Sequence, residues 1–283
     1  MFQEEYYGEH IDSEVYPSDP KTQEVKDLLL KEFSQNPKGV YYQRQLEVWY
    51  EKKFFHWVTD RALREQEDEG KIIVDYFPIK VGEHKNRLKI ITLSSNRYYR
   101  RPAKQVMKLV EEYCSPEITQ DVGLIGQEMF KVAYARFGYR LIKEDAGEFN
   151  GKVWRRSKKD LDFIVEKNGA YFGCEVKNTL GYIDKNEIDE KIDMCKFFGI
   201  IPVFIMRYSP TVWNNEIYEK GGFVQIFDKQ IFPPGRKKLV DRLREELKLP
   251  VLTSTRIPNS IMDRIDKTIN ERVFLKRDCE KKK

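Results

Sequence analysis

The stretch DLDFIVEKNGAYFGCEVKNT, residues 160–179, contains two apolar-rich runs that are separated by Asn168 and Gly169. An Asn-Gly pair between two such runs is the strongest short signal for a β-hairpin with a two-residue turn. If these two residues form the turn, the register places Asp162 directly opposite Glu175. The stretch therefore predicts a hairpin of two antiparallel strands whose register is set by its turn.

This register sorts the side chains by face, because successive residues of a strand point to opposite sides of the sheet. One face is apolar and predicts a core side, with Leu161, Phe163, Val165, Phe172, Cys174 and Val176. The other face carries Asp160, Asp162, Glu175 and Lys177. We therefore expect a packed hairpin whose second face gathers three acids and one lysine.

The opposed carboxylates predict a site for a divalent cation. Directly opposed residues have Cβ atoms roughly 4.5–5.5 Å apart, so the charges of Asp162 and Glu175 repel in a hairpin that has only a structural role. Mg²⁺ would reverse the sign of that interaction, and it typically takes one or two carboxylates together with waters. Lys177, on the same face, is placed to orient or deprotonate a metal-bound water or to stabilise charge in a transition state.

The residues Asp162, Glu175 and Lys177 resemble the motif of the PD-(D/E)XK nucleases, which share the core of restriction endonucleases. The resemblance covers about residues 120–230, although Leu161 stands where the family name has proline. It implies a Mg²⁺-dependent endonuclease that hydrolyses DNA phosphodiester bonds, with Mn²⁺ as a substitute ion. It also implies that Asp162, Glu175 and the backbone carbonyl of Val176 bind the metal, and that Lys177 positions the attacking water.

Two assignments at this site have alternatives. Asp160 competes with Asp162 as the metal-binding aspartate, and a bulge in either strand would exchange their roles. Upstream, the predicted helix of residues 117–137 is similar to the helix that precedes the core in the resolvase-like and restriction-like branches of the family. There a glutamate reaches the metal, so the resemblance implies that Glu128 is a further catalytic residue.

The chain divides into two expected domains. Residues 20–95 contain three helical patterns followed by two strand patterns, and TDRALREQEDEGKI (59–72) resembles the recognition helix and first wing strand of a winged-helix (αααββ) domain. Residues 117–255 mix strands with helices, which predicts an α/β (α+β) restriction-endonuclease-like domain with a central mixed sheet. The other segments are an acidic flexible tail (1–19), a basic linker with a connecting helix (96–116), and a C-terminal helix with a basic tail (256–283).

The charge distribution favours DNA as the partner. Residues 1–20 hold six acids and no Lys or Arg, which leaves 51 basic against 40 acidic residues in the rest of the chain. A basic body attracts a polyanion. In a winged helix the third helix enters the major groove and the wing contacts the backbone. The expected nucleic-acid contacts are Arg61 and Arg64 in that helix, Lys85, Arg87 and Lys89 in the wing, Arg100 and Arg101 in the linker, the run Arg155, Arg156, Lys158 and Lys159, and Asn178.

Some of these assignments also have alternatives. Four acids end the same third helix, Glu65, Glu67, Asp68 and Glu69, and because they repel phosphate the first domain is alternatively a protein-interaction module. Glu187 and Lys191 are four residues apart in a predicted helix, which is typical of a surface ion pair, with contact to the site as the alternative. For the whole chain, the alternative to a restriction-like or repair nuclease is a non-catalytic winged-helix DNA-binding regulator with a degenerate nuclease fold.

The composition excludes other classes. The four cysteines form no CxxC pair, and all three histidines precede residue 85, so the second half has no histidine-ligated metal and no histidine-based triad. There is no apolar run of the ~18 residues that a membrane helix needs, and the start of the chain lacks signal-peptide character. We therefore expect an intracellular, cytoplasmic protein in a reducing compartment (nucleoid-associated if prokaryotic), with no membrane partner. Dimers are common in the family, which implies a homodimer.

Overall fold

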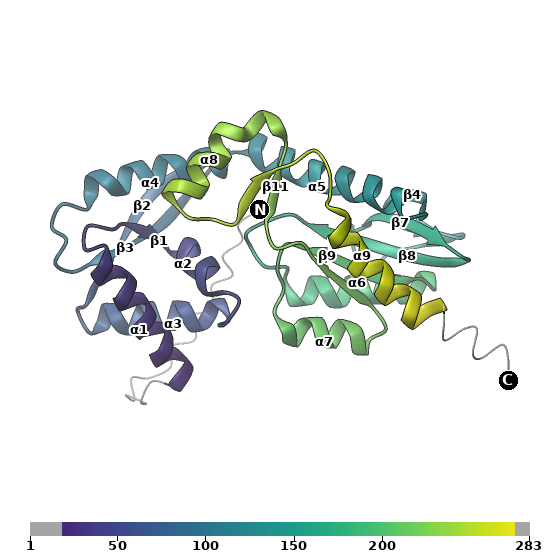
Figure 1. Ribbon diagram of the computed structural model, residues 1–283, viewed down its shortest axis with the longest axis horizontal. Helices are drawn as coiled ribbons and strands as arrows, with labels where there is room; N and C mark the ends of the chain where they lie inside the picture. The colour runs from purple at the N-terminus through teal and green to yellow at the C-terminus, as the bar shows by residue number, and fades with distance from the viewer. Residues whose placement is uncertain (1–18, 275–283) are drawn as a thin grey trace.

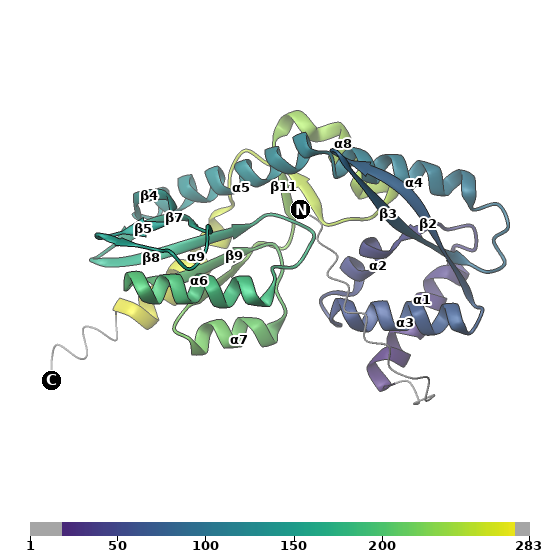
Figure 2. The ribbon, with the colours of Figure 1, turned by 180° about the vertical axis from the view of Figure 1, so that it is seen from behind.

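The computed structural model describes residues 19–274, which form a mixed α/β fold with nine α-helices and a central mixed sheet (Figure 1). Seen from either side, the molecule has two halves next to one another, and helices α4, α5 and α8 run along one common edge (Figures 1 and 2). The acidic tail expected at residues 1–19, apart from Asp19, lies outside the described residues, and so does the basic end of the chain from residue 275 onward.

The N-terminal half consists of three helices and a three-stranded antiparallel sheet in the order β1-β3-β2. Its elements are α1 (Pro20–Gln35), β1 (Tyr41–Tyr42), α2 (Gln43–Tyr50), α3 (His56–Asp68), β2 (Ile72–Val81) and β3 (His84–Leu93). Asp19 caps α1 by accepting hydrogen bonds from the N–H groups of Lys21 and Thr22, as an N-cap residue does. The order of the helices and of the last two strands in residues 20–95 is the predicted one, and the short strand β1 between α1 and α2 was not predicted.

The C-terminal half contains a five-stranded sheet in the order β10-β9-β8-β7-β4, in which β4, β7 and β8 are antiparallel and β8, β9 and β10 are parallel. Its elements are α5 (Pro116–Arg136), β4 (Arg140–Ala146), β5 (Glu148–Phe149), β6 (Lys152–Val153), β7 (Leu161–Lys167), β8 (Ala170–Lys177), α6 (Lys185–Phe198), β9 (Ile201–Met206), α7 (Thr211–Glu219), β10 (Phe223–Ile226), α9 (Asn259–Ile269) and η2 (Asn270–Phe274). Apolar clusters place α5 and α9 on one face of this sheet and α6 and α7 on the other.

The β7–β8 hairpin has the predicted register as far as Phe163 opposite Cys174. Asn168 and Gly169 form the turn with φ angles of 51° and 74°. Positive φ at both central residues is what a type I′ turn requires, and Asn-Gly tolerates it best. The turn therefore sets the register, as the sequence predicts.

The pairing of β7 with β8 ends at Phe163 opposite Cys174, so the predicted pair of Asp162 opposite Glu175 is not part of the ladder. Leu161 was expected on the same face as Phe163, but it packs on the opposite face with Ile164 and Cys195. This is possible because Gly173 leaves that space open, since a Cβ there would lie 2.8 Å from Leu161 Cδ1. Asp162 therefore lies in the part of β7 that pairs with β4 but is beyond the ladder with β8.

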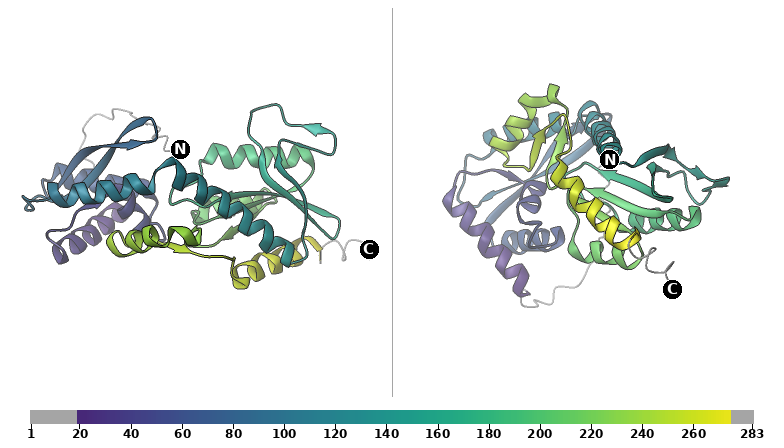
Figure 3. Two further views of the ribbon diagram at one scale, coloured as in Figure 1. Left: turned by 90° about the horizontal axis from the view of Figure 1, so that it is seen from above. Right: turned by 45° about the vertical axis from the view of Figure 1, so that its right-hand side comes forward.

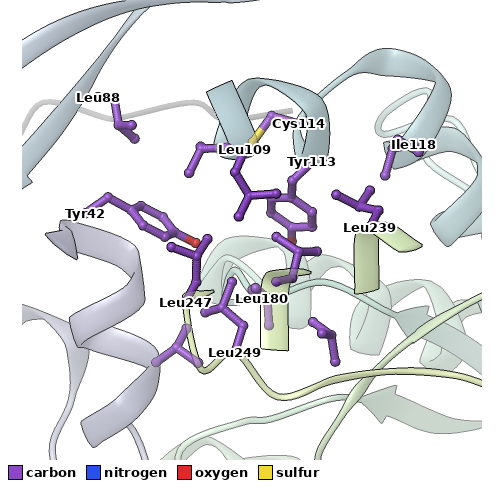
Figure 4. Close-up of a cluster of buried hydrophobic side chains, with 14 of the residues drawn as sticks. Tyr42, Leu88, Leu109, Tyr113, Cys114, Ile118, Leu180, Leu239, Leu247 and Leu249 are labelled. Carbon is purple, nitrogen blue, oxygen red and sulfur yellow. The ribbon is translucent and has the colours of Figure 1, made fainter. Parts of the chain in front are cut away.

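The two halves share one buried core. It combines β1 and β3 of the first half with α4 (Arg100–Tyr113), the start of α5, and a segment that returns from the second half. That segment contains β11 (Gln230–Phe232), η1 (Pro234–Arg236), α8 (Lys237–Glu246) and β12 (Val251–Thr253). Figure 4 shows Leu239, Leu247 and Leu249 of this segment around Tyr42 and Tyr113. The segment from β11 to β12, which the sequence assigns to the second domain, thus packs against the N-terminal half through α8.

No helix among residues 19–274 has both the length and the apolar character that crossing a membrane requires.

Candidate active site at the beta7–beta8 hairpin

Asp162 is held at the start of β7 by two neighbouring elements. Its Oδ2 accepts a hydrogen bond from the backbone N–H of Val176 in β8 at 2.6 Å, and its Oδ1 accepts one from Nε2 of Gln127 in α5 at 2.8 Å. Beyond the end of the β7–β8 ladder, the carboxylate points toward the neighbouring strand and α5 and not squarely away from the sheet. The structure therefore places Asp162 where β7, β8 and α5 meet.

Glu175 is almost completely buried and contacts two lysines. Its Oε1 lies 2.9 Å from Nζ of Lys177, and its Oε2 lies 2.6 Å from Nζ of Lys191. Lys177 also binds Glu187 Oε1 at 2.7 Å. Glu187 and Lys191 come from α6, so this helix supplies two groups to the site and not a surface ion pair.

Asp160, the alternative candidate for the metal-binding aspartate, lies elsewhere than Asp162. Its backbone carbonyl accepts a hydrogen bond from Lys191. The expected pairing of Asp160 with Lys177 does not occur, because the β7–β8 ladder ends before Asp162. Of the two aspartates, only Asp162 is bonded to the N–H next to Glu175.

The electrostatics of the site follow from burial and close charges. Burial and the charge of Glu175 raise the pKa of Asp162 to about 7, although the Val176 N–H and the two lysines act in the opposite direction. Burial acts to lower the pKa of Lys177, but Glu175 and Glu187 outweigh it and hold that pKa above its ordinary value. Lys177 is therefore a firmly protonated group, which can donate hydrogen bonds and stabilise negative charge but is a poor general base.

The donor atoms present fit one hard divalent cation. Within residues 19–274 no group of three or more His, Cys, Asp or Glu residues could hold a metal ion by itself. Mg²⁺ does not need such a group, because it binds through one or two carboxylates plus waters and substrate phosphate. Asp162 and Glu175 supply the carboxylates. The carbonyl of Val176 points to the same side of β8 as its N–H, toward Asp162, which adds a third hard oxygen.

Glu128 is not brought to this site. Its side chain is 61% exposed and pairs with Lys131, which also pairs with Glu144. The preceding residue, Gln127, contacts Asp162 in its place. Consecutive helical residues point about 100° apart because a turn takes 3.6 residues, so a shift of one residue changes the face. The structure therefore places Gln127, and not Glu128, in contact with Asp162. No motif in the sequence pointed to Gln127.

Several residues expected to contact DNA are engaged within the protein. Asn178 is buried, where its side-chain amide donates to the carbonyls of Val122 and Ile231 and its oxygen accepts from the Ile231 N–H. That side chain is structural, which corrects its expected role. Arg61 pairs with Glu65 and Asp19, and Arg64 pairs with Asp60, so these two charges are largely compensated.

The other expected contacts remain exposed. Arg100 and Arg101 lie in the first turn of α4. In the run before β7, Arg156 pairs with Asp193 at 3.4 Å and Lys159 pairs with Glu190 at 2.8 Å, both on α6. Arg155 and Lys158 are both exposed, without an ion-pair partner within the described part of the chain. The basic run therefore lies against α6, which also carries Glu187 and Lys191.

The β2–β3 hairpin carries a basic face that the sequence showed only in part. Its apolar residues, among them Ile79 and Leu88, point into the shared core. The opposite face has Lys80 directly opposite Lys85, with Arg87 the next residue along on that face. In the left view of Figure 3 this hairpin (blue) and the β5–β6 hairpin (teal) project to the same side of the molecule. Lys80 and Lys85 therefore repel each other, because like charges that face each other destabilise a hairpin.

The comparisons with known proteins give no family. No protein-family model, no curated protein and no solved structure matches the chain. The class of site is therefore defined by geometry alone, as a buried and a half-buried carboxylate with two lysines on a mixed α/β sheet. Any activity is argued from the residues of this chain.

Proposed function

We propose that the protein is a Mg²⁺-dependent nuclease that hydrolyses DNA phosphodiester bonds, most simply an endonuclease. In this proposal the β7–β8 hairpin is the PD-(D/E)XK motif of a restriction-endonuclease-like core, and the N-terminal half is a winged-helix-like DNA-binding module. The observation that carries the proposal is that the half-buried Asp162 lies within electrostatic reach of the buried Glu175, with Lys177 in contact with Glu175. Two carboxylates in one partly buried place favour a cation between them.

Each residue of the site has a role in this reaction. Asp162, Glu175 and the Val176 carbonyl would hold Mg²⁺, which when bound supplies positive charge to the scissile phosphate and makes a coordinated water more acidic. Gln127 and the Val176 N–H keep Asp162 in place. Lys177, being protonated, would donate a hydrogen bond to the attacking water or to a phosphate oxygen as negative charge develops there.

The distribution of charge supports a polyanionic substrate. The acidic centre alone repels phosphate, so binding requires basic surfaces around it and a cation within it. The β2–β3 hairpin and the run before β7 supply such surfaces, with Lys80 and Lys85 in the first and Arg155 and Lys158 in the second. These residues would contact the phosphate backbone, which positions a duplex without reading its sequence.

The experiment is a cleavage assay on a panel of substrates with Mg²⁺, Mn²⁺ or EDTA. The panel contains supercoiled plasmid, linear duplex, single strand, flap and four-way junction, each as DNA and the linear forms also as RNA. We expect metal-dependent cleavage by the wild type and a loss of about 10²–10³-fold in Glu175→Ala and Lys177→Ala, as the removal of a group that stabilises charge commonly produces. DNA binding by these variants should persist.

The matched control is Asp189→Asn, which removes a carboxylate charge from α6 at an exposed ion pair with Lys220. It should cut at the wild-type rate. Equal cleavage by Glu175→Ala and wild type would contradict the proposal and point to a contaminating nuclease. Tight DNA binding without cleavage in either metal would instead favour the non-catalytic DNA-binding alternative.

A further inference from the structure

Lys191 lies inside the candidate metal site, and we infer that its ammonium group replaces a second divalent cation and limits the site to one metal ion. The inference rests on the proposed metal-dependent function and adds the number of ions to it. Lys191 is then a positioning residue, because it acts through Glu175 and does not contact the substrate.

The contacts of Lys191 are those that a second cation would use. Its Nζ lies 2.6 Å from Glu175 Oε2 and also contacts the backbone carbonyl oxygen of Asp160. A carboxylate oxygen and a backbone carbonyl are hard oxygen ligands of the kind that Mg²⁺ and Mn²⁺ bind. The ammonium therefore occupies the space beside both atoms.

The position of Lys191 is fixed by its helix. Its side chain is 6% exposed and that of Glu175 is 4% exposed, so neither charge has ready access to water. On either side of it in α6, Ile188 and Ile192 are buried against the sheet, which holds the helix at this distance. Moving the ammonium away would leave Glu175 buried without a partner at that oxygen, which is strongly unfavourable.

The charges of the site agree with a single divalent ion. Three carboxylates, those of Asp162, Glu175 and Glu187, face the two ammonium groups of Lys177 and Lys191. One divalent cation changes the sum of these charges from −1 to +1. A second would raise it to +3 and would lie beside the fixed ammonium of Lys191, where like charges repel strongly because water is excluded.

The number of bound ions can be counted without any cleavage reaction. Mn²⁺ is titrated into the full chain, and free Mn²⁺ is followed by electron paramagnetic resonance with calorimetry as a second measure of stoichiometry. We expect one ion per chain for the wild type and two for Lys191→Gln, in which Glu175 Oε2 and the Asp160 carbonyl become available. Lys191→Arg keeps the charge and should bind one.

The matched control is Lys220→Gln at the end of α7, which removes an exposed ion pair with Asp189 of α6 and should leave the count at one. Circular dichroism verifies that each variant is folded. Two ions in the wild type, or a single ion in folded Lys191→Gln, would overturn the inference while leaving the nuclease proposal intact. If Lys191→Gln does not fold, the number of Mn²⁺ ions bound by the wild type and by Lys191→Arg tests the inference. A wild type that binds no Mn²⁺ at all would contradict the proposed function itself.

Discussion

Glu51, at the end of α2, and Arg207, directly after β9, form a two-pronged salt bridge that is buried between the two halves of the protein. Their side chains are 3% and 1% exposed. Arg207 also donates hydrogen bonds to the backbone carbonyls of Thr179 and Leu180, in the segment that follows Lys177. The N-terminal half is therefore bonded to the chain that leaves β8, and the position of one half depends on the other.

The first prediction concerns this buried pair. Glu51→Ala should lower the free energy of unfolding by about 3–5 kcal/mol, because it leaves the Arg207 charge buried without its partner. Urea denaturation measures the loss. Lys52→Ala is the matched control, since Lys52 pairs with Asp228 at an exposed position nearby, with 71% and 47% exposure. We expect a change of less than about 1 kcal/mol there. Equal losses in the free energy of unfolding for the two variants would show that the buried Glu51–Arg207 pair stabilises the fold no more than an exposed ion pair.

The second prediction concerns pH. Burial and Glu175 raise the pKa of Asp162 from 3.8 to about 7 in the metal-free protein. Between those two pH values the folded protein therefore binds a proton that the unfolded chain releases, so the free energy of unfolding falls as pH rises from about 4 to about 7. Each pKa unit corresponds to about 1.4 kcal/mol. Above about pH 7 the free energy of unfolding is reduced by the full cost of keeping the Asp162 carboxylate ionised in the folded protein.

Urea denaturation of the metal-free wild type and of Asp162→Asn, from pH 4.5 to 8, tests this sign. Asn carries no charge at any pH, so the difference between the two proteins should grow in favour of the variant up to about pH 7 and then stay constant. Mg²⁺ should remove the wild-type penalty, since it binds the ionised carboxylate. A difference that shrinks with rising pH would contradict the raised pKa.

The parts of the fold that could be predicted are those that local sequence determines. Asn168 and Gly169 set the register of the hairpin because the turn they prefer requires positive φ at both positions. The same register also predicts Asp162 directly opposite Glu175, which is wrong, because the ladder ends at Phe163 and Cys174. The place of Lys177 beside Glu175 could be predicted, because strand residues two apart share a face.

The parts that could not be predicted depend on tertiary contacts. Leu161 changes faces only because Gly173 leaves room beside Cys195, and those residues come from three different elements. Gln127 replaces Glu128 because packing selects the rotation of α5. Likewise, the pattern of α8 shows that it is amphipathic but not that its apolar side packs on the N-terminal half.

The third prediction uses two glycines of α5 that differ in their surroundings. A Cβ at Gly126 would lie 2.8 Å from Cβ of Asn178, whereas at Gly123 no atom lies within 4 Å. Gly126→Ala should therefore destabilise the protein by about 1–3 kcal/mol, because it pushes on a buried amide that holds α5 and β11 together. Gly123→Ala should stabilise it by up to about 1 kcal/mol through helix propensity. Thermal unfolding of both variants checks these changes. A change of stability in the same direction for both would contradict the close approach between Gly126 and Asn178.

The fourth prediction concerns the proposed DNA binding and distinguishes two surfaces of the N-terminal half, the β2–β3 hairpin and α3. Lys80 and Lys85 face each other on the exposed side of the β2–β3 hairpin, whereas Arg61 and Arg64 of α3 are already paired with acids. The double variant Lys80→Ala/Lys85→Ala should bind duplex DNA more weakly. The slope of log K against log salt should fall by up to about 2, since each phosphate contact contributes about 0.9.

The same double variant should be slightly more stable than the wild type, by a few tenths of a kcal/mol to about 1 kcal/mol, because removing two opposed like charges relieves their repulsion. Weaker binding together with higher stability is a combination that general damage to the fold would not produce. The comparison variant is Arg61→Ala/Arg64→Ala, which removes the same number of charges from α3 and should leave the salt slope nearly unchanged. A larger loss of slope in the α3 variant than in the hairpin variant would show that α3 contacts the phosphates and that its ion pairs open on binding.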